Sequence, residues 1–166
     1  MLGPENAIWD DGEWVSWNEI NQQLQYQEWG AKYPNADRSL IPIFESLLSL
    51  AEEFHAATGS HLQVYGDIGE LFCAITHGLK LNRNYAPGAD GRLGKDHVEV
   101  KTITPFKNSD AVEVKASGNF SKLFVVKINA EFEIAGRLID RKHLPPAKRG
   151  KIQVRWQDLP GLGPQA

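Results

Sequence analysis

The run KLFVVKIN at residues 122–129 restricts the fold most strongly, because it is almost continuously apolar. A strand with one buried face alternates apolar and polar residues, whereas a continuous apolar run suits a strand buried on both faces. The next segment, 131–139, does alternate, so Phe132 and Ile134 are expected to face inward. Asn129–Ala130 would make the tight connection between these two strands.

Helical periodicity dominates the chain before this run. Three helices are expected, at about 17–31, 40–57 and 61–78. A serine stands at each start: Ser16 and Ser60 open Ser-x-x-Glu and Ser-x-x-Gln capping boxes, and Ser39 precedes the second helix. Residues 1–15 show no periodicity and are expected to be irregular.

Short extended segments fill most of the second half. Besides the two strands above, strands are expected at about 88–94, 97–103, 111–117 and 151–156, with a short helical turn at 141–145. Three helices followed by a mainly antiparallel sheet indicate the α+β class and one domain. The expected organisation is a helical N-terminal layer packed on the core (1–60), the core itself (61–157) and a tail (158–166).

The composition excludes several other classes of protein. A chain of 166 residues with 42% hydrophobic and 23% charged residues can form one globular domain with a core. Cys73 is the only cysteine, which excludes an internal disulfide and a cysteine-based zinc site. The chain lacks an apolar run of the roughly 20 residues that span a bilayer, and its N-terminus lacks the features of a signal peptide. We therefore expect a cytoplasmic protein without a membrane partner.

Charge is divided unevenly along the chain. Residues 1–100 hold 6 Lys and Arg against 15 Asp and Glu, whereas residues 101–166 hold 12 against 6. The net charge of −3 argues against a strongly basic nucleic-acid-binding protein. The basic segment 140–156 is nevertheless suited to face phosphates. An ordinary solvated surface explains the same charges.

The tetrapeptide VEVK occurs twice, at 98–101 and at 112–115. In each copy the glutamate and the lysine are two residues apart, so on a strand both leave the same face. Around the second copy nothing completes an acidic cluster. Glu113 and Lys115 are therefore interpreted as the solvated face of an amphipathic strand.

The first copy has a carboxylate nearby in the sequence. Asp90 precedes Glu99 by nine residues, and a reversal at the intervening glycines would return it beside Glu99 on a neighbouring strand. Two adjacent carboxylates repel unless a cation joins them, and Mg²⁺ or Mn²⁺ prefers such oxygen ligands. The backbone carbonyl of Val100 could add another oxygen. Lys101, on the same face, could then orient a water molecule or hold a phosphate.

A third carboxylate is expected from the helix at 61–78. Glu70 lies on the helix face opposite the main apolar face, together with Gly66, Cys73 and His77. If that face packs on the sheet, Glu70 points toward Asp90. If it does not, Glu70 is simply exposed to solvent.

These residues, in the order GDIGELF, GLKLN and PGADGRLGKDHVEVKT, resemble the PD-(D/E)XK nuclease superfamily, which has the restriction-endonuclease-like fold. The closest resemblance is to small bacterial domains of this type, and it covers roughly residues 62–156. Two departures are visible. Ala89 stands where proline commonly precedes the aspartate, and an extra strand is expected between Lys101 and residue 122 where the family usually has a helix.

The resemblance implies an αβββαβ core, one or two Mg²⁺ or Mn²⁺ ions and hydrolysis of phosphodiester bonds in DNA, as in restriction or phage defence. Asp90 and Glu99 would ligate the metal, Lys101 would be the catalytic lysine and Glu70 the auxiliary acid. The alternative is a catalytically silent module of the same fold that binds nucleic acid or a partner protein, with the Trp-rich residues 1–60 as its interaction surface. Nucleases of this size often act as homodimers.

Contacts to the nucleic-acid backbone are expected from the basic side chains outside this cluster. The candidates are His97, Lys107, Lys115, Arg141, Lys142, Lys148 and Arg149. His97 shares its strand face with Glu99 and Lys101, which would bring it near a bound phosphate.

Overall fold

The computed structural model describes residues 7–10, 12–83 and 88–161. The helices among them are α1 (Trp17–Lys32), α2 (Ile41–Thr58) and α3 (Tyr65–His77), with the 3-10 turns η1 (Arg38–Leu40), η2 (Arg141–His143) and η3 (Trp156–Asp158). The strands are β1 (Ala7–Asp10), β2 (Glu13–Ser16), β3 (Lys80–Leu81), β4 (Gly91–Leu93), β5 (Asp96–Ile103), β6 (Ala111–Lys115), β7 (Lys122–Ile128), β8 (Ile134–Asp140) and β9 (Lys151–Arg155). The α+β class and the expected helices are thus confirmed.

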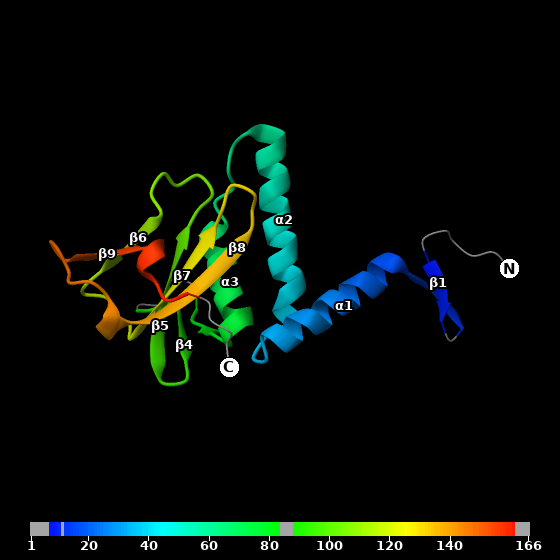
Figure 1. The fold of residues 1–166 in the computed structure, drawn as a ribbon, viewed down its shortest axis with the longest axis horizontal. Coiled ribbons are helices and arrows are strands. Elements are labelled where there is room, and N and C mark those ends of the chain that lie inside the picture. Colours follow the sequence, from blue (N-terminus) through cyan, green and yellow to red (C-terminus); the bar gives the residue numbers. More distant parts are fainter. Residues whose placement is uncertain (1–6, 11, 84–87, 162–166) are drawn as a thin grey trace.

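The main sheet has the strand order β3-β4-β5-β7-β8. Its pairs are antiparallel except for β5 and β7, which run parallel with Val100 opposite Phe124. The sheet is therefore mixed and mostly antiparallel, as expected. The apolar run forms β7, whose residues Leu123 to Val126 are fully buried because α3 covers one face and β6 lies against the other (Figure 1).

Helix α3 packs on the sheet through a close contact between Gly69 and β5. A Cβ atom at Gly69 would lie 2.2 Å from the Oγ1 atom of Thr102, whereas a Cβ at Gly66 would meet nothing within 4 Å. Gly69 is therefore the glycine that the packing requires, and Gly66 is not. Cys73 on the same helix is fully buried in the core cluster.

Strands β6 and β9 form a separate antiparallel sheet in which Glu113 is opposite Gln153. Its apolar side chains pack with Ile103, Leu123 and Val125 in a second core cluster. Because β6 lies between β5 and β7 in the chain, the connection of these parallel strands contains a strand where the αβββαβ order calls for a helix. Leu159, two residues beyond the expected end of the core, is also buried in this cluster.

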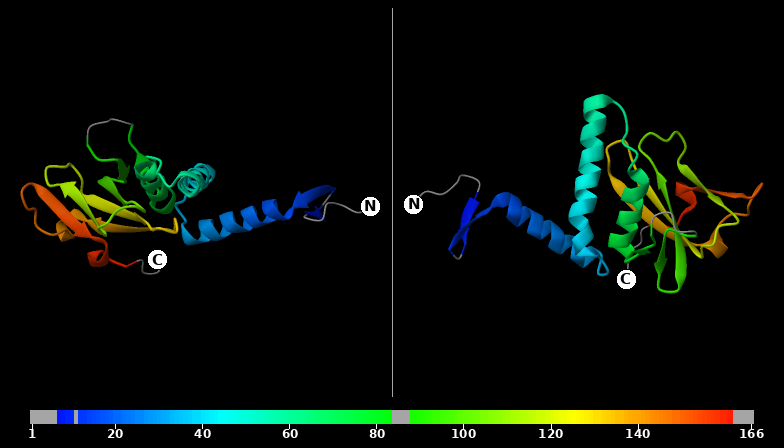
Figure 2. Two further views of the ribbon diagram at one scale, coloured as in Figure 1. Left: turned by 90° about the horizontal axis from the view of Figure 1, so that it is seen from above. Right: turned by 180° about the vertical axis from the view of Figure 1, so that it is seen from behind.

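The N-terminal elements extend away from the sheet. Helix α2 lies along α3, whereas α1 projects outward and carries the β1–β2 hairpin at its far end (Figures 1 and 2). The C-terminal part of α1 contacts the core, where Trp29 packs against Phe44 and Phe72. Within the part of the chain that the structure describes, no helix is both long and apolar enough to cross a membrane.

Several boundaries differ from those expected. The segment before α1 is a hairpin in which Trp9 is opposite Trp14, so the expectation of an irregular start was wrong for the described residues 7–10 and 12–15. Asp37 rather than Ser39 caps the turn before α2, because its carboxylate accepts a hydrogen bond from the Ser39 N–H (3.0 Å). Helix α3 begins at Tyr65, so Ser60 opens no capping box.

The hairpin of β7 and β8 also has a longer connection than expected. The side chain of Asn129 accepts hydrogen bonds from the backbone N–H groups of Glu131 and Glu133, and β8 begins only at Ile134. Phe132 has a φ of 60° in this connection but is buried, as expected for its side chain.

Candidate functional site

The candidate site lies at the start of β4, beside the middle of β5. Asp90 immediately precedes β4, and its Oδ2 atom accepts a hydrogen bond of 2.7 Å from the backbone N–H of Val100. Its backbone carbonyl accepts a second hydrogen bond, of 2.9 Å, from Asn82. The Asp90 carboxylate is thereby held against the middle of β5, as the spacing to Glu99 predicted.

Glu99 and Lys101 lie on one face of β5, two residues apart. Their side chains form an ion pair in which the lysine Nζ is 2.8 Å from Oε1 of Glu99. The exposed fractions are 38% for Lys101 and 21% for Glu99, so the pair is partly shielded from water. Val98 and Val100, which alternate with these residues, are buried in the core cluster with α3.

Glu70 on α3 is electrostatically coupled to this group. Burial, followed by the charges of Asp90, Asp67 and Glu99, raises the pKa of Glu70 to about 7, and Lys101 opposes this shift. Cys73 and His77, on the helix face that carries Glu70, turn toward the sheet: Cys73 is fully buried, and the ring of His77 lies 4.8 Å from that of Phe124 on β7.

Asp90 experiences the same environment. Burial and the charge of Glu99 raise the pKa of Asp90 above its ordinary value, while the hydrogen bond from Val100 and the charge of Lys101 act in the opposite direction. A raised pKa in a carboxylate beside other carboxylates marks a place where negative charge is poorly compensated. Such clusters occur preferentially at functional sites.

The donor chemistry of this cluster suits a hard divalent cation. Asp90 and Glu99 offer carboxylate oxygens, and the carbonyl of Val100 points to the same side of β5 as its N–H, toward Asp90. Among the described residues, no three His, Cys, Asp or Glu side chains are grouped so as to hold an ion by themselves. Magnesium usually needs fewer protein ligands, because one or two carboxylates, water and substrate phosphates complete its shell.

The second VEVK segment lies across a hollow from the first. Glu113 and Lys115 on β6 are exposed, as predicted, but they line the same hollow of 610 Å³ as Glu99 and Lys101. Lys151 on β9 lines it too and forms a 2.8 Å ion pair with Glu113. The sequence does not predict this arrangement, because the packing of β6 opposite β5 has no local signal.

Arg141 makes several contacts within the protein. Its guanidinium donates hydrogen bonds to the backbone carbonyls of Ala116, Gly118 and Phe120 and stacks on the ring of Phe120. These contacts give Arg141 a structural role, and its contact with phosphates stays a prediction. Arg141 joins η2 to the loop between β6 and β7, and every described donor contact is internal.

The other predicted cations divide into two groups. Lys115, Lys148 and Arg149 line hollows beside the site, whereas Lys107 and Lys142 are exposed elsewhere and line none of these hollows. His97 lines a further hollow, of 370 Å³, beside Arg92.

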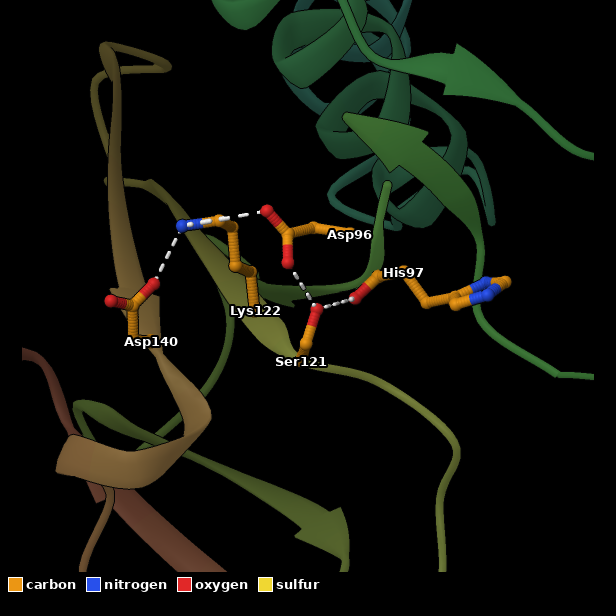
Figure 3. A network of polar contacts seen from close by, with 5 residues as sticks. All are labelled: Asp96, His97, Ser121, Lys122 and Asp140. Atoms are coloured by element: carbon orange, nitrogen blue, oxygen red, sulfur yellow. Dashed lines mark hydrogen bonds and ion pairs between the residues drawn. The ribbon is translucent and has the colours of Figure 1, made fainter. Parts of the chain in front are cut away.

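A network of ion pairs fixes the end of β5 near His97. Lys122 contacts Asp140 at 2.6 Å and Asp96 at 3.9 Å, and the hydroxyl of Ser121 donates a hydrogen bond to Asp96 (2.8 Å). The backbone N–H of Ser121 donates to the carbonyl of His97 (2.9 Å). Figure 3 shows that the imidazole of His97 points away from this network, so the charges of the network do not involve the ring.

His77 lies on the same helix face as Glu70, but its contacts are with the ring of Phe124 and the hydroxyl of Thr76. Its ring lies 4.8 Å from that of Phe124, and its Nδ1 atom is 2.8 Å from the hydroxyl of Thr76. Burial lowers the pKa of His77. The ring therefore packs against the sheet rather than entering the acidic cluster.

Comparison with known proteins adds no family to this geometry: no protein-family model matches the chain, and no curated protein matches it significantly.

Proposed function

We propose that the chain is a metal-dependent nuclease that hydrolyses phosphodiester bonds of DNA, in the manner of restriction or phage-defence enzymes. One observation carries the proposal: Glu70, Asp90, Glu99 and Lys101 form a single electrostatic cluster. Three carboxyl groups that destabilise one another's charge are costly unless a cation or a proton is used there. The order of these residues along the chain is the order expected from the resemblance to the PD-(D/E)XK superfamily. That the chain has the αβββαβ core of this superfamily is part of the proposal.

Each side chain has a role in this proposal. Asp90 and Glu99, with the carbonyl of Val100, would hold Mg²⁺ or Mn²⁺, which when bound supplies positive charge to the phosphate and acidity to its water. Lys101 orients the attacking water or the phosphate oxygen. Glu70, with its pKa of about 7, can accept a proton from water near neutral pH.

A cleavage assay on plasmid and on single- and double-stranded oligonucleotides, with Mg²⁺, Mn²⁺ or EDTA, tests the proposal. Metal-dependent cutting is expected for the wild type and for Glu133→Gln, which removes an exposed carboxylate outside the site. Lys101→Ala and Asp90→Asn should abolish it while the circular dichroism spectrum remains unchanged. Cutting that survives both substitutions would place the chemistry elsewhere.

The second candidate is a catalytically silent module of the same fold that binds nucleic acid or a partner protein. It is favoured by the ion pair that Lys101 makes with Glu99 and by the lack of three grouped metal-ligand side chains among the described residues. Manganese binding measured by electron paramagnetic resonance separates the two candidates. A nuclease should bind Mn²⁺ in a way that Asp90→Asn weakens, whereas a silent module should leave the spectrum of the free ion unchanged.

A further inference from the structure

Three hollows that share lining residues lie beside the acidic cluster. The hollow of 370 Å³ that contains Arg92 and His97 shares Gly88 and Asn119 with the 610 Å³ hollow of Glu99 and Lys101. The latter shares Glu113 and Lys151 with a third hollow, of 420 Å³. Shared walls make the three hollows neighbours, with the acidic cluster beside the middle one. We call these three adjoining hollows together the site groove.

Cations stand at both ends of the site groove. Arg92 is exposed at one end, on β4 opposite His97. Lys148, Arg149 and Lys151 line the other end, and Lys115 lines the middle hollow. The two glutamates in the groove, Glu99 and Glu113, are each paired with a lysine, so the groove has an excess of positive charge.

A tight turn holds the cations at the second end. Lys148 and Lys151 exchange both backbone hydrogen bonds, of 2.8 and 3.1 Å, across Arg149 and Gly150. The central residues have φ values of 53° and 76°, as in the two-residue turns with positive φ that close β-hairpins. An arginine at positive φ is uncommon, since asparagine or glycine usually takes such a position. The turn thus presents three cations within four residues.

We propose that the site groove binds one strand of nucleic acid, which runs past the acidic cluster with phosphates on both sides of it. The choice of ligand rests on the proposed function and extends it to a substrate class: an unpaired strand that is cut internally. Each hollow has the volume of a pocket that encloses a small molecule. That size suits the backbone and bases of a single strand better than a duplex, and a groove with positive charge along a strand is the usual means of binding one.

Fluorescence anisotropy with a short labelled oligothymidylate tests binding separately from catalysis. The assay uses Asp90→Asn protein in EDTA, so that no cleavage occurs. Arg149→Asn removes a charge but suits the positive φ of the turn, and Arg92→Gln removes one at the other end. Lys107→Gln is the matched control, because Lys107 is exposed but lines none of the three hollows. Each groove variant should weaken binding several-fold and reduce the salt dependence by about 0.7 in the slope of log K against log salt.

The opposite results are equally clear. Any one of three results would overturn the assignment. The groove variants could bind as tightly as Lys107→Gln, or a duplex could bind more tightly than the single strand. The third such result is displacement of the labelled strand by polyglutamate as effectively as by unlabelled oligothymidylate.

Cleavage then tests the internal position of the site. Wild-type protein with Mg²⁺ should linearise circular single-stranded DNA, because a strand that continues through both ends of the groove needs no free end. Cleavage that occurs only from free ends would overturn the internal position. Binding as expected without any cleavage would support the groove and remove the proposed hydrolysis, so the two proposals fail separately.

Discussion

Replacing Glu70 by glutamine is expected to change how the stability of the protein depends on pH. In the folded protein, burial and the neighbouring carboxylates raise the pKa of Glu70 from 4.5 to about 7. The folded state therefore holds a proton over this range that the unfolded chain has released. Because the unfolded state binds fewer protons, the free energy of unfolding falls as pH rises from about 4.5 to about 7.

The size of the effect follows from the shift. Each pKa unit corresponds to about 1.4 kcal/mol, so a shift from 4.5 to about 7 gives an upper limit of about 3.5 kcal/mol, which solvent screening of this partly buried carboxyl group reduces. Asp90, whose pKa is also raised, contributes in the same direction. Glu70→Gln removes the larger of the two contributions and part of the repulsion that raises the pKa of Asp90.

Urea unfolding in EDTA, followed by tryptophan fluorescence, measures this effect at about pH 5 and about pH 8. The wild type should lose stability between these values, and Glu70→Gln should lose clearly less and be the more stable protein at about pH 8. Glu133→Gln, which alters an exposed carboxylate outside the site, should behave as the wild type. An unchanged pH dependence in Glu70→Gln would refute the electrostatic coupling of the site.

Three further tests examine the packing around the site. Gly69→Ala should lower the free energy of unfolding by roughly 1–3 kcal/mol, because the added methyl group would meet the hydroxyl of Thr102. Gly66→Ala should raise the free energy of unfolding by up to about 1 kcal/mol, because the space beside Gly66 is open. Urea unfolding measures both changes. Arg141→Ala should lower the thermal midpoint through the loss of its internal hydrogen bonds, and lysine at this position should restore little of it. Burial raises the pKa of the Cys73 thiol, so Ellman's reagent should react with it only after unfolding.

Local patterns predicted the elements that surround the site. The continuous apolar run forms β7, and the alternating segment around Glu99 forms β5. A strand buried on both faces has a continuous apolar sequence, whereas a strand buried on one face has an alternating sequence, so both patterns are visible in the sequence. The nine-residue spacing from Asp90 to Glu99 also predicted their approach, since a short hairpin joins them. Contacts between neighbouring strands are thus accessible to sequence reasoning.

Contacts between distant segments were not predictable in the same way. The carbonyl acceptors of Arg141 lie more than twenty residues before it, so its basic character alone suggested a surface role. The two-residue strand β3 has two exposed side chains and therefore no hydrophobic pattern. Only the structure shows the tight turn at Arg149–Gly150 and places it at the end of the groove.

The two VEVK segments show that the role of a short segment depends on the residues that the fold places beside it. Both are strands with a glutamate and a lysine on one face, and each glutamate has a lysine at 2.8 Å. The partner of Glu99 is the lysine of its own segment, whereas Glu113 pairs with Lys151 of the next strand. Only the first segment lies beside Asp90 and Glu70, so only there does carboxylate repulsion accumulate. The second segment forms the opposite wall of the same hollow, so each copy contributes a different part of the candidate site.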